Sequence, residues 1–212
     1  IKKIFSQDFP HSLGSFYSTF TEICGFKPQS DEWKLMGAAA YGKNNRYYKK
    51  LQNLIHLKSD GSFELDLNYF NFYNFHKPNF YNKKLLNFIG LEKNENREKL
   101  KQPYYDLAFA AQKIFEDIYF HLINNLYKKK PNQNLVISGG CALNSLANGK
   151  ILKKTKFRNL YIPPVPDDSG AGLGAACYIN TQIHSKKTFR LSNNYLGPKF
   201  SNPVFYVNIV PI

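Results

Sequence analysis

Apolar residues in this chain of 212 residues recur mostly at helical spacing. The longest such pattern covers residues 103–127, where the apolar positions form one wide stripe. Another begins after Ser12, a good N-cap residue, and ends at Gly25. Residues 30–42 and 82–89 predict two shorter helices. The length fits one domain, or one lobe of a larger two-lobed protein.

Shorter apolar or alternating runs predict strands. Residues 54–58 and 63–67 flank a turn that contains Gly and predict a β-hairpin. Residues 1–8 are consistent with another short strand. Residues 69–81 are rich in aromatic residues and Asn but show no clean period. We therefore predict that 55–100 forms a peripheral insertion of hairpin and loops.

The stretch 134–150 is the strongest candidate for ligand binding. A run of apolar residues leads directly into Gly139 and Gly140, and a helical pattern follows, which indicates a buried strand, a tight turn and a helix N-terminus. Glycines there let a ligand approach the backbone, and free N–H groups of a first helical turn favour an anion such as phosphate. Asn144, one turn further, is placed to bind a ribose or phosphate oxygen. The alternative is that both glycines serve only close packing of the corner.

A second unit of the same kind follows. Residues 159–162 predict a strand, and a turn with Asp167, Asp168 and Ser169 leads into a helix of small residues. The two units form a βαβα pair whose ligand-facing corners should lie side by side. Carboxylates beside a phosphate-binding corner are the usual arrangement for a divalent metal. Helix N-capping is the alternative role for these three residues.

Composition and charge restrict the partners. The chain has 29 Lys and Arg against 15 Asp and Glu, a formal charge of +14, but the basic residues lie in small scattered groups, so we expect no nucleic-acid partner. Its three cysteines are widely spaced without a CxxC pair, as in a reduced protein. We find no signal-peptide pattern and no apolar run long enough to span a membrane. We therefore expect a cytoplasmic protein without a membrane partner.

Three blocks together carry a family resemblance. They read PHSLG at 10–14, EWKLMG at 32–37 with Tyr41 and Gly42 after it, and GGCALN at 139–144 with DSG at 168–170 after it. In their order and spacing, over nearly all of residues 9–200, they resemble the NodU/CmcH-type O-carbamoyltransferases that tailor nodulation factors and antibiotics.

The resemblance implies a fold and an activity. The fold would be α/β of the ASKHA type, similar to actin, Hsp70 and ribonuclease H, with added helices and a β-hairpin. Residues 1–200 would form the C-terminal lobe of the transfer domain, and 201–212 an exit linker or truncated end. The activity would be ATP-dependent transfer of a carbamoyl group from carbamoyl phosphate, through carbamoyl-adenylate, to a hydroxyl of a sugar or secondary metabolite.

The resemblance also implies roles for individual residues, although it assigns no catalytic residue. By similarity, Asp168 would be a ligand of a divalent metal, with Fe²⁺ expected. The residues that would bind the nucleotide are Gly139, Gly140, Asn144, Glu32, Lys34, Gly37 and Gly42.

Two parts of the family pattern are absent from this sequence: an N-terminal histidine motif that supplies further metal ligands, and a C-terminal domain that forms carbamoyl-adenylate. We therefore expect this chain to be one part of an enzyme. Its partners would be the missing N-terminal lobe, the missing C-terminal activating domain and a small-molecule hydroxyl acceptor. One alternative is a related tRNA threonylcarbamoyl-transferase-type protein, which the YGK at 41–43 and the DSG at 168–170 disfavour. The other is a non-catalytic nucleotide-binding lobe of a truncated or split enzyme.

Overall fold

The computed structural model describes residues 2–96 and 99–184. The chain divides into two compact units, Ile1–Ser169 and Gly170–Ile212. Within the described part of the second unit lies helix α8 (Ala171–His184), which confirms the small-residue helix predicted after Ser169. The predicted exit linker at 201–212 lies outside the described residues.

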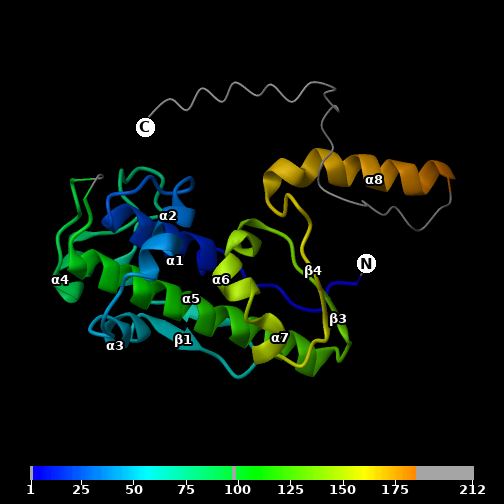
Figure 1. Cartoon of the computed structure of the whole chain (residues 1–212), viewed down its shortest axis with the longest axis horizontal. Coiled ribbons are helices and arrows are strands. Elements are labelled where there is room, and N and C mark those ends of the chain that lie inside the picture. The colour runs from blue at the N-terminus through cyan, green and yellow to red at the C-terminus, as the bar shows by residue number, and fades with distance from the viewer. Residues whose placement is uncertain (1, 97–98, 185–212) are drawn as a thin grey trace, which may run out of the picture. The chain divides into compact units, whose positions relative to one another are not determined.

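The first unit mixes helices with two small sheets (Figure 1). Its α-helices are α1 (Leu13–Ile23), α2 (Glu32–Ala39), α3 (Tyr48–Gln52), α4 (Lys83–Ile89), α5 (Gln102–Lys129), α6 (Ser145–Asn148) and α7 (Ile151–Lys154). Its strands are β1 (Ile55–Leu57), β2 (Phe63–Leu65), β3 (Asn134–Val136) and β4 (Asn159–Tyr161). It also contains the 3₁₀ turns η1 (Leu67–Tyr69) and η2 (Gly140–Leu143), and the turn η3 (Asp168–Gly170) begins at its end. The predicted α/β class is confirmed, and the ASKHA-type fold stays a prediction.

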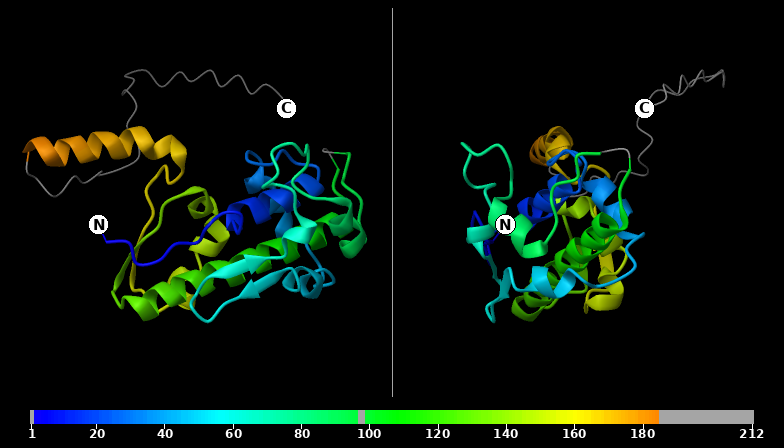
Figure 2. Two further views of the ribbon diagram at one scale, coloured as in Figure 1. Left: turned by 180° about the vertical axis from the view of Figure 1, so that it is seen from behind. Right: turned by 90° about the vertical axis from the view of Figure 1, so that its left-hand side faces the viewer.

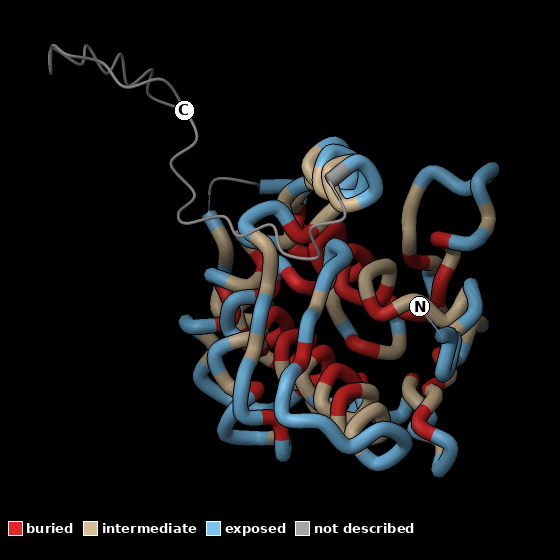
Figure 3. Tube along the Cα trace, turned by 90° about the vertical axis from the view of Figure 1, so that its right-hand side faces the viewer, coloured by how far each residue is buried: buried red, intermediate tan, exposed pale blue. Residues whose placement is uncertain are grey.

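Helix α5, 28 residues long, is the centre of this unit. Helices α1 and α2 lie on one side of it, and α3 and β1 on the other (Figure 1). The apolar stripe predicted for 103–127 is the buried face of the helix, and Figure 3 marks the buried segments. Each large apolar side chain removed from water stabilises the fold by about 1.5–3 kcal/mol. The fully buried apolar residues of α5 include Leu107, Ala108, Ala110, Ala111 and Ile118.

Helix α1 forms where its sequence pattern predicted. The Ser12 side chain accepts a hydrogen bond from the backbone N–H of Ser15 at 3.2 Å, which caps the first turn. Phe16 and Phe20 are fully buried and meet edge to face, with ring centroids 4.9 Å apart. The chain leaves the helix through Gly25, whose φ of 89° is a left-handed conformation that side chains disfavour.

The predicted hairpin is confirmed as the antiparallel pair β1–β2, with Ile55 opposite Leu65. Its turn lies against the C-terminal half of α5 (Figure 2), where Lys129 Nζ donates to the carbonyl of Asp60 at 2.7 Å. No strand forms over 2–8, and the side chain of Gln7 instead bonds the backbone of Phe63 at 3.1 Å in both directions.

The aromatic stretch that follows the hairpin contributes to the core. Phe70, Phe72 and Tyr81 are buried, and Phe70 pairs with Tyr81 through an antiparallel bridge. Phe70, Phe72 and Tyr81 therefore belong to the core, while the division that makes 55–100 an insertion stays a prediction. They pack as rings from an irregular segment, without the regular spacing by which a buried face is recognised in sequence.

Strands β3 and β4 pair in parallel, with Leu135 opposite Leu160. This confirms the two predicted strands and their crossover. The prediction of a helix directly after the glycines was wrong. The 3₁₀ turn η2 follows them first, and the helices after it, α6 and α7, are each only four residues long. In the described part of the chain, no helix is both long and apolar enough to cross a membrane.

Candidate functional site

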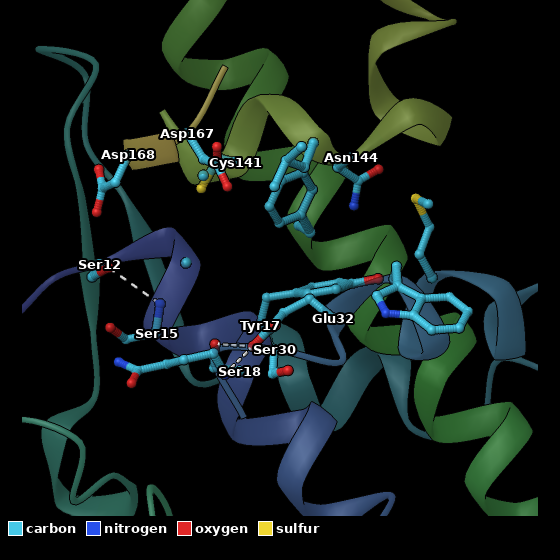
Figure 4. Close-up of a pocket in the computed structure, with 17 residues that line it drawn as sticks. Ser12, Ser15, Tyr17, Ser18, Ser30, Glu32, Cys141, Asn144, Asp167 and Asp168 are labelled. Carbon is cyan, nitrogen blue, oxygen red and sulfur yellow. Dashed lines mark hydrogen bonds between the residues drawn. The ribbon is translucent and has the colours of Figure 1, made fainter. Parts of the chain in front are cut away.

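A cavity of about 930 Å³ opens beside the carboxyl ends of β3 and β4 (Figure 4). Phe115 of α5 also lines it. The other lining residues come from the start of α1, the start of α2 with the loop before it, the corner after β3, and the turn after β4. In that order they are Ser12, Gly14, Ser15, Tyr17, Ser18, Gln29, Ser30, Glu32, Trp33, Met36, Gly140, Cys141, Leu143, Asn144, Asp167 and Asp168.

The turns after β3 and β4, which were predicted to lie side by side, are neighbours in the structure. Gly139, with φ of 101°, donates its backbone N–H to the carbonyl of Pro166 at 2.6 Å. The hydroxyl of Ser138 donates to the same carbonyl at 2.9 Å. These bonds join the turn after β3 to the turn after β4, so that Gly140 and Asp167 line the same cavity.

The wall formed by α1 and α2 is fixed by Glu32. One carboxylate oxygen of Glu32 accepts from the hydroxyl of Ser18 at 2.5 Å and from the backbone N–H of Gln29 at 2.6 Å. Ser18 lies on α1 and Glu32 begins α2, so this oxygen joins the two helices at the cavity (Figure 4). Glu32 therefore lines the cavity with a carboxylate whose position is fixed by α1 and by the loop before α2.

A buried polar cluster lies at the inner end of the cavity. The phenol of Tyr17 donates to Gln112 Oε1 at 2.7 Å, and the amides of Gln112 and Asn144 bond each other at 2.9 and 3.0 Å. All three side chains are buried. Burial raises the pKa of Tyr17 well above its ordinary value. Tyr17 is therefore a neutral hydrogen-bond donor at every physiological pH.

The cavity is acidic. Among residues 2–96 and 99–184, those that line it include three carboxylates, Glu32, Asp167 and Asp168, and no Lys, Arg or His. Burial raises the pKa of Cys141 to about 11, so its thiol stays protonated at neutral pH and adds no charge. Ser, Asn and Tyr side chains supply the remaining polar groups, and Trp33, Met36, Leu143 and Phe115 supply apolar surface. Such a site favours a ligand with hydroxyl groups and an apolar ring face over a polyanion.

Comparison with known proteins gives the family. Residues 2–177 match the family described as Carbamoyltransferase N-terminus. This chain belongs to the carbamoyltransferase family. The match includes every residue that lines the cavity.

Individual relatives agree. The chain is 38% identical over 199 residues to an uncharacterised protein of Synechocystis, covering 92% of this chain and 32% of the relative. It is 28% identical over 193 residues to nodulation protein NolO of Bradyrhizobium diazoefficiens, covering 91% and 33%. A shorter match to nodulation protein U of Azorhizobium caulinodans is 46% identical over 46 residues, or 22% of this chain and 8% of the relative. The predicted NodU-type carbamoyltransferase family is confirmed, and the chain spans about a third of the length of the first two relatives.

Of the residues predicted to bind nucleotide, Gly140, Asn144 and Glu32 line the cavity, as does the predicted metal ligand Asp168. Gly139 forms the turn next to them without lining it.

The other three predicted residues lie elsewhere. The ammonium group of Lys34 pairs with the carboxylate of Asp31 at 3.2 Å. Gly37 lies on α2 with open space where a side chain would begin, and it does not line the cavity. Gly42 packs directly on α5, where an added Cβ would meet Phe109 Cβ at 2.4 Å. A role of Gly42 in close packing is therefore visible, and nucleotide binding by these three residues stays a prediction.

The donor set around Asp168 does not suffice for a metal ion. Within residues 2–96 and 99–184, no group of three or more His, Cys, Asp and Glu side chains is arranged to hold one. The neighbouring carboxylates of Asp167 and Asp168 can provide only some of the six or more oxygen ligands of a hard cation such as Ca²⁺. The predicted metal at Asp168 stays a prediction, and no chemical step below depends on it.

Sequence reasoning did not find several residues of the site. Ser12 was predicted only as a helix N-cap, and Gln112 lies within the predicted helix 103–127 without a predicted role. A polar residue within an apolar stripe is a signal, but its partner Asn144 lies 32 positions away, and no spacing rule connects the two.

Proposed function

We propose that this chain forms part of the transfer domain of an ATP-dependent O-carbamoyltransferase. In this reaction the carbamoyl group of carbamoyl phosphate is activated as carbamoyl-adenylate and passes to a hydroxyl of a sugar or secondary metabolite. Family membership supports the reaction class. The acceptor class and the adenylate intermediate are parts of the proposal.

One observation carries the proposal. Glu32 of the second sequence block lines a single cavity together with Gly140, Asn144 and Asp168 of the third. The cavity lies at the carboxyl ends of two parallel strands, which is where α/β sheets bind ligands. Its volume of about 930 Å³ is within the range of about 300–1,000 Å³ typical of small-molecule sites.

The charge of the lining favours a particular form of the nucleotide. Two like unit charges 4 Å apart in water repel each other by about 1 kcal/mol, and more where water is excluded. ATP brings several negative charges toward the carboxylates, whereas an adenylate brings one. The hydroxyl and amide groups of Ser15, Ser18 and Asn144 suit ribose oxygens and a carbamoyl carbonyl. We therefore assign the adenylate to this cavity.

The proposed step transfers the carbamoyl group from the adenylate to the acceptor hydroxyl. The acceptor hydroxyl oxygen bonds to the carbamoyl carbon, the bond from that carbon to the phosphate oxygen breaks, and AMP leaves with the electron pair. The hydroxyl proton passes to a base. The carboxylates of Asp167 and Asp168 line the cavity and are the candidates for this base.

Calorimetric titration of AMP into this chain, in the presence of EDTA, tests the proposal. We expect saturable binding, and about fivefold tighter binding in Asp168→Asn, since one like charge near the phosphate is removed. Asp60→Asn, which removes an exposed carboxylate in the hairpin turn, is the matched control and should bind like wild type. Absence of saturable binding of AMP by the folded protein would reject the proposal.

A further inference from the structure

We propose that Gln112 is a positioning residue of the cavity. Its amide holds the side chain of Asn144 in a single orientation, and it does so from behind the cavity wall. Gln112 itself does not line the cavity, whereas its partners Asn144 and Tyr17 both do. The inference deepens the proposed function and rests on it only for the identity of the ligand.

The hydrogen-bonding capacity of Gln112 is fully used. Its oxygen accepts from Tyr17 Oη at 2.7 Å and from Asn144 Nδ2 at 2.9 Å. Its nitrogen donates to Asn144 Oδ1 at 3.0 Å and to Glu116 Oε1 at 3.0 Å. An amide offers two donors and two acceptor sites, so all four are satisfied in a place where water has little access.

The direction of both amides follows from the main chain. Asn144 Oδ1 also accepts from the backbone N–H of Ala147 at 3.0 Å, as the N-cap of α6. This identifies the oxygen of Asn144, because an amide nitrogen could not accept that bond. The Asn144 nitrogen must then face the Gln112 oxygen. Turning either amide would bring two N–H groups together and two carbonyls together.

The same face of α5 holds the rest of the corner. Glu116, four residues after Gln112, accepts from Lys150 Nζ at 2.6 and 2.7 Å. Tyr119 donates to Asn148 Oδ1 at 3.0 Å. Residues 112, 116 and 119 share one face of α5. Their side chains bond Asn144, Lys150 and Asn148 respectively, so they hold the segment after β3 along its length. The backbone of the corner is therefore held at several points, whereas the Asn144 side chain is held by Gln112 and by its own N-cap bond with Ala147.

A purely structural role for Gln112 would give a different result. Its loss would then lower stability without a specific effect on Asn144. A positioning role predicts that the Asn144 side chain loses its single orientation, and that ligand affinity falls more than the loss of stability explains. Gln102, at the start of the same helix, is a matched control because its amide nitrogen donates two bonds away from the cavity, to Tyr41 O and Asp106 Oδ1.

The test is ¹⁵N NMR of side-chain amides, with the Asn144 signals assigned by their loss in Asn144→Asp. In wild type we expect two well-separated amide protons that exchange slowly with water. In Gln112→Leu we expect exchange at least tenfold faster and AMP affinity at least tenfold weaker, with neither change in Gln102→Leu. Unchanged Asn144 signals in folded Gln112→Leu would overturn the proposal.

A second variant keeps the test valid where Gln112→Leu does not fold. Gln112→Glu retains the shape, but its carboxylate faces Asn144 Oδ1 and Glu116, with Lys150 and the neutral Tyr17 as the other polar groups nearby. The carboxylate keeps the acceptor for Asn144 Nδ2 but loses the donor to Asn144 Oδ1. We therefore expect the Asn144 signals to be displaced from their wild-type positions at pH 8 and to return toward them on acidification, as the protonated carboxyl regains a donor. Signals that do not respond to pH would refute the positioning role. Failure of AMP to bind wild type would reject only the proposed function, since the amide signals need no ligand.

Discussion

Replacing Gly42 with Ala should destabilise the fold although both residues are small. Gly42 lies directly after α2, and the segment around it is fixed to α5, since the backbone N–H of Lys43 donates to Asp106 Oδ1 at 2.8 Å. A Cβ on Gly42 would lie 2.4 Å from Phe109 Cβ and 2.9 Å from the carbonyl oxygen of Tyr105. Both atoms are on or next to the helix backbone and cannot rotate away.

The size of the effect follows from this overlap. Carbon atoms in contact prefer about 3.5–4.0 Å, so the segment and α5 must separate by roughly 1 Å. Overpacking of this kind costs about 1–3 kcal/mol, and Ala regains about 0.4–1 kcal/mol by restricting the unfolded chain. The net loss is about 1–2 kcal/mol. For a chain of this size that lowers the Tm by about 2–8 °C.

Thermal unfolding followed by circular dichroism measures this change in Tm, with Gly37→Ala as the control. Gly37 is on α2 with no atom within 4 Å of an added Cβ, so Ala there should raise stability by up to about 1 kcal/mol through helix propensity. Both glycines were predicted to line the nucleotide cleft. Gly42→Ala as stable as Gly37→Ala would refute the packing role of Gly42.

Three further predictions concern single side chains. Ser12→Ala removes the N-cap of α1 and should lower the free energy of unfolding in urea by about 1 kcal/mol; an unchanged midpoint would contradict the capping role. Cys141, whose pKa burial raises to about 11, should react with iodoacetamide roughly 100-fold more slowly at pH 8 than a free thiol, as peptide mass spectrometry would show; equal rates would count against a buried thiol. Burial raises the pKa of Glu22 above 4.5, so the folded state favours the protonated carboxyl and stability is lost as pH rises through that pKa. Glu22→Gln should therefore be more stable than wild type at pH 7, with a smaller difference at pH 4; a difference independent of pH would show that ionisation of Glu22 has no effect.

Periodic elements were predictable from the sequence. Helix α5 was predicted over 103–127 and spans Gln102–Lys129, because its apolar stripe has helical period throughout. The hairpin and the parallel pair β3–β4 followed from short apolar runs around turn residues. Their corners share a cavity because parallel strands end at the same edge.

Other features depend on contacts between distant residues, which a single sequence does not contain. The aromatic side chains near Phe70 are buried without periodicity. Gly42 was placed in the cleft by resemblance, and its contact with Phe109 arises only when α2 packs on α5. The role of Gln112 depends on Tyr17 and Asn144, and the three residues belong to three different elements.

A crystal structure of this chain with AMP would test the central claim most directly. If the chain belongs to the transfer domain as proposed, AMP should occupy the cavity beside Gly140, with Asn144 in its present orientation and Asp168 near the phosphate. AMP bound at another surface, or a cavity left without AMP at a saturating concentration, would contradict the claim.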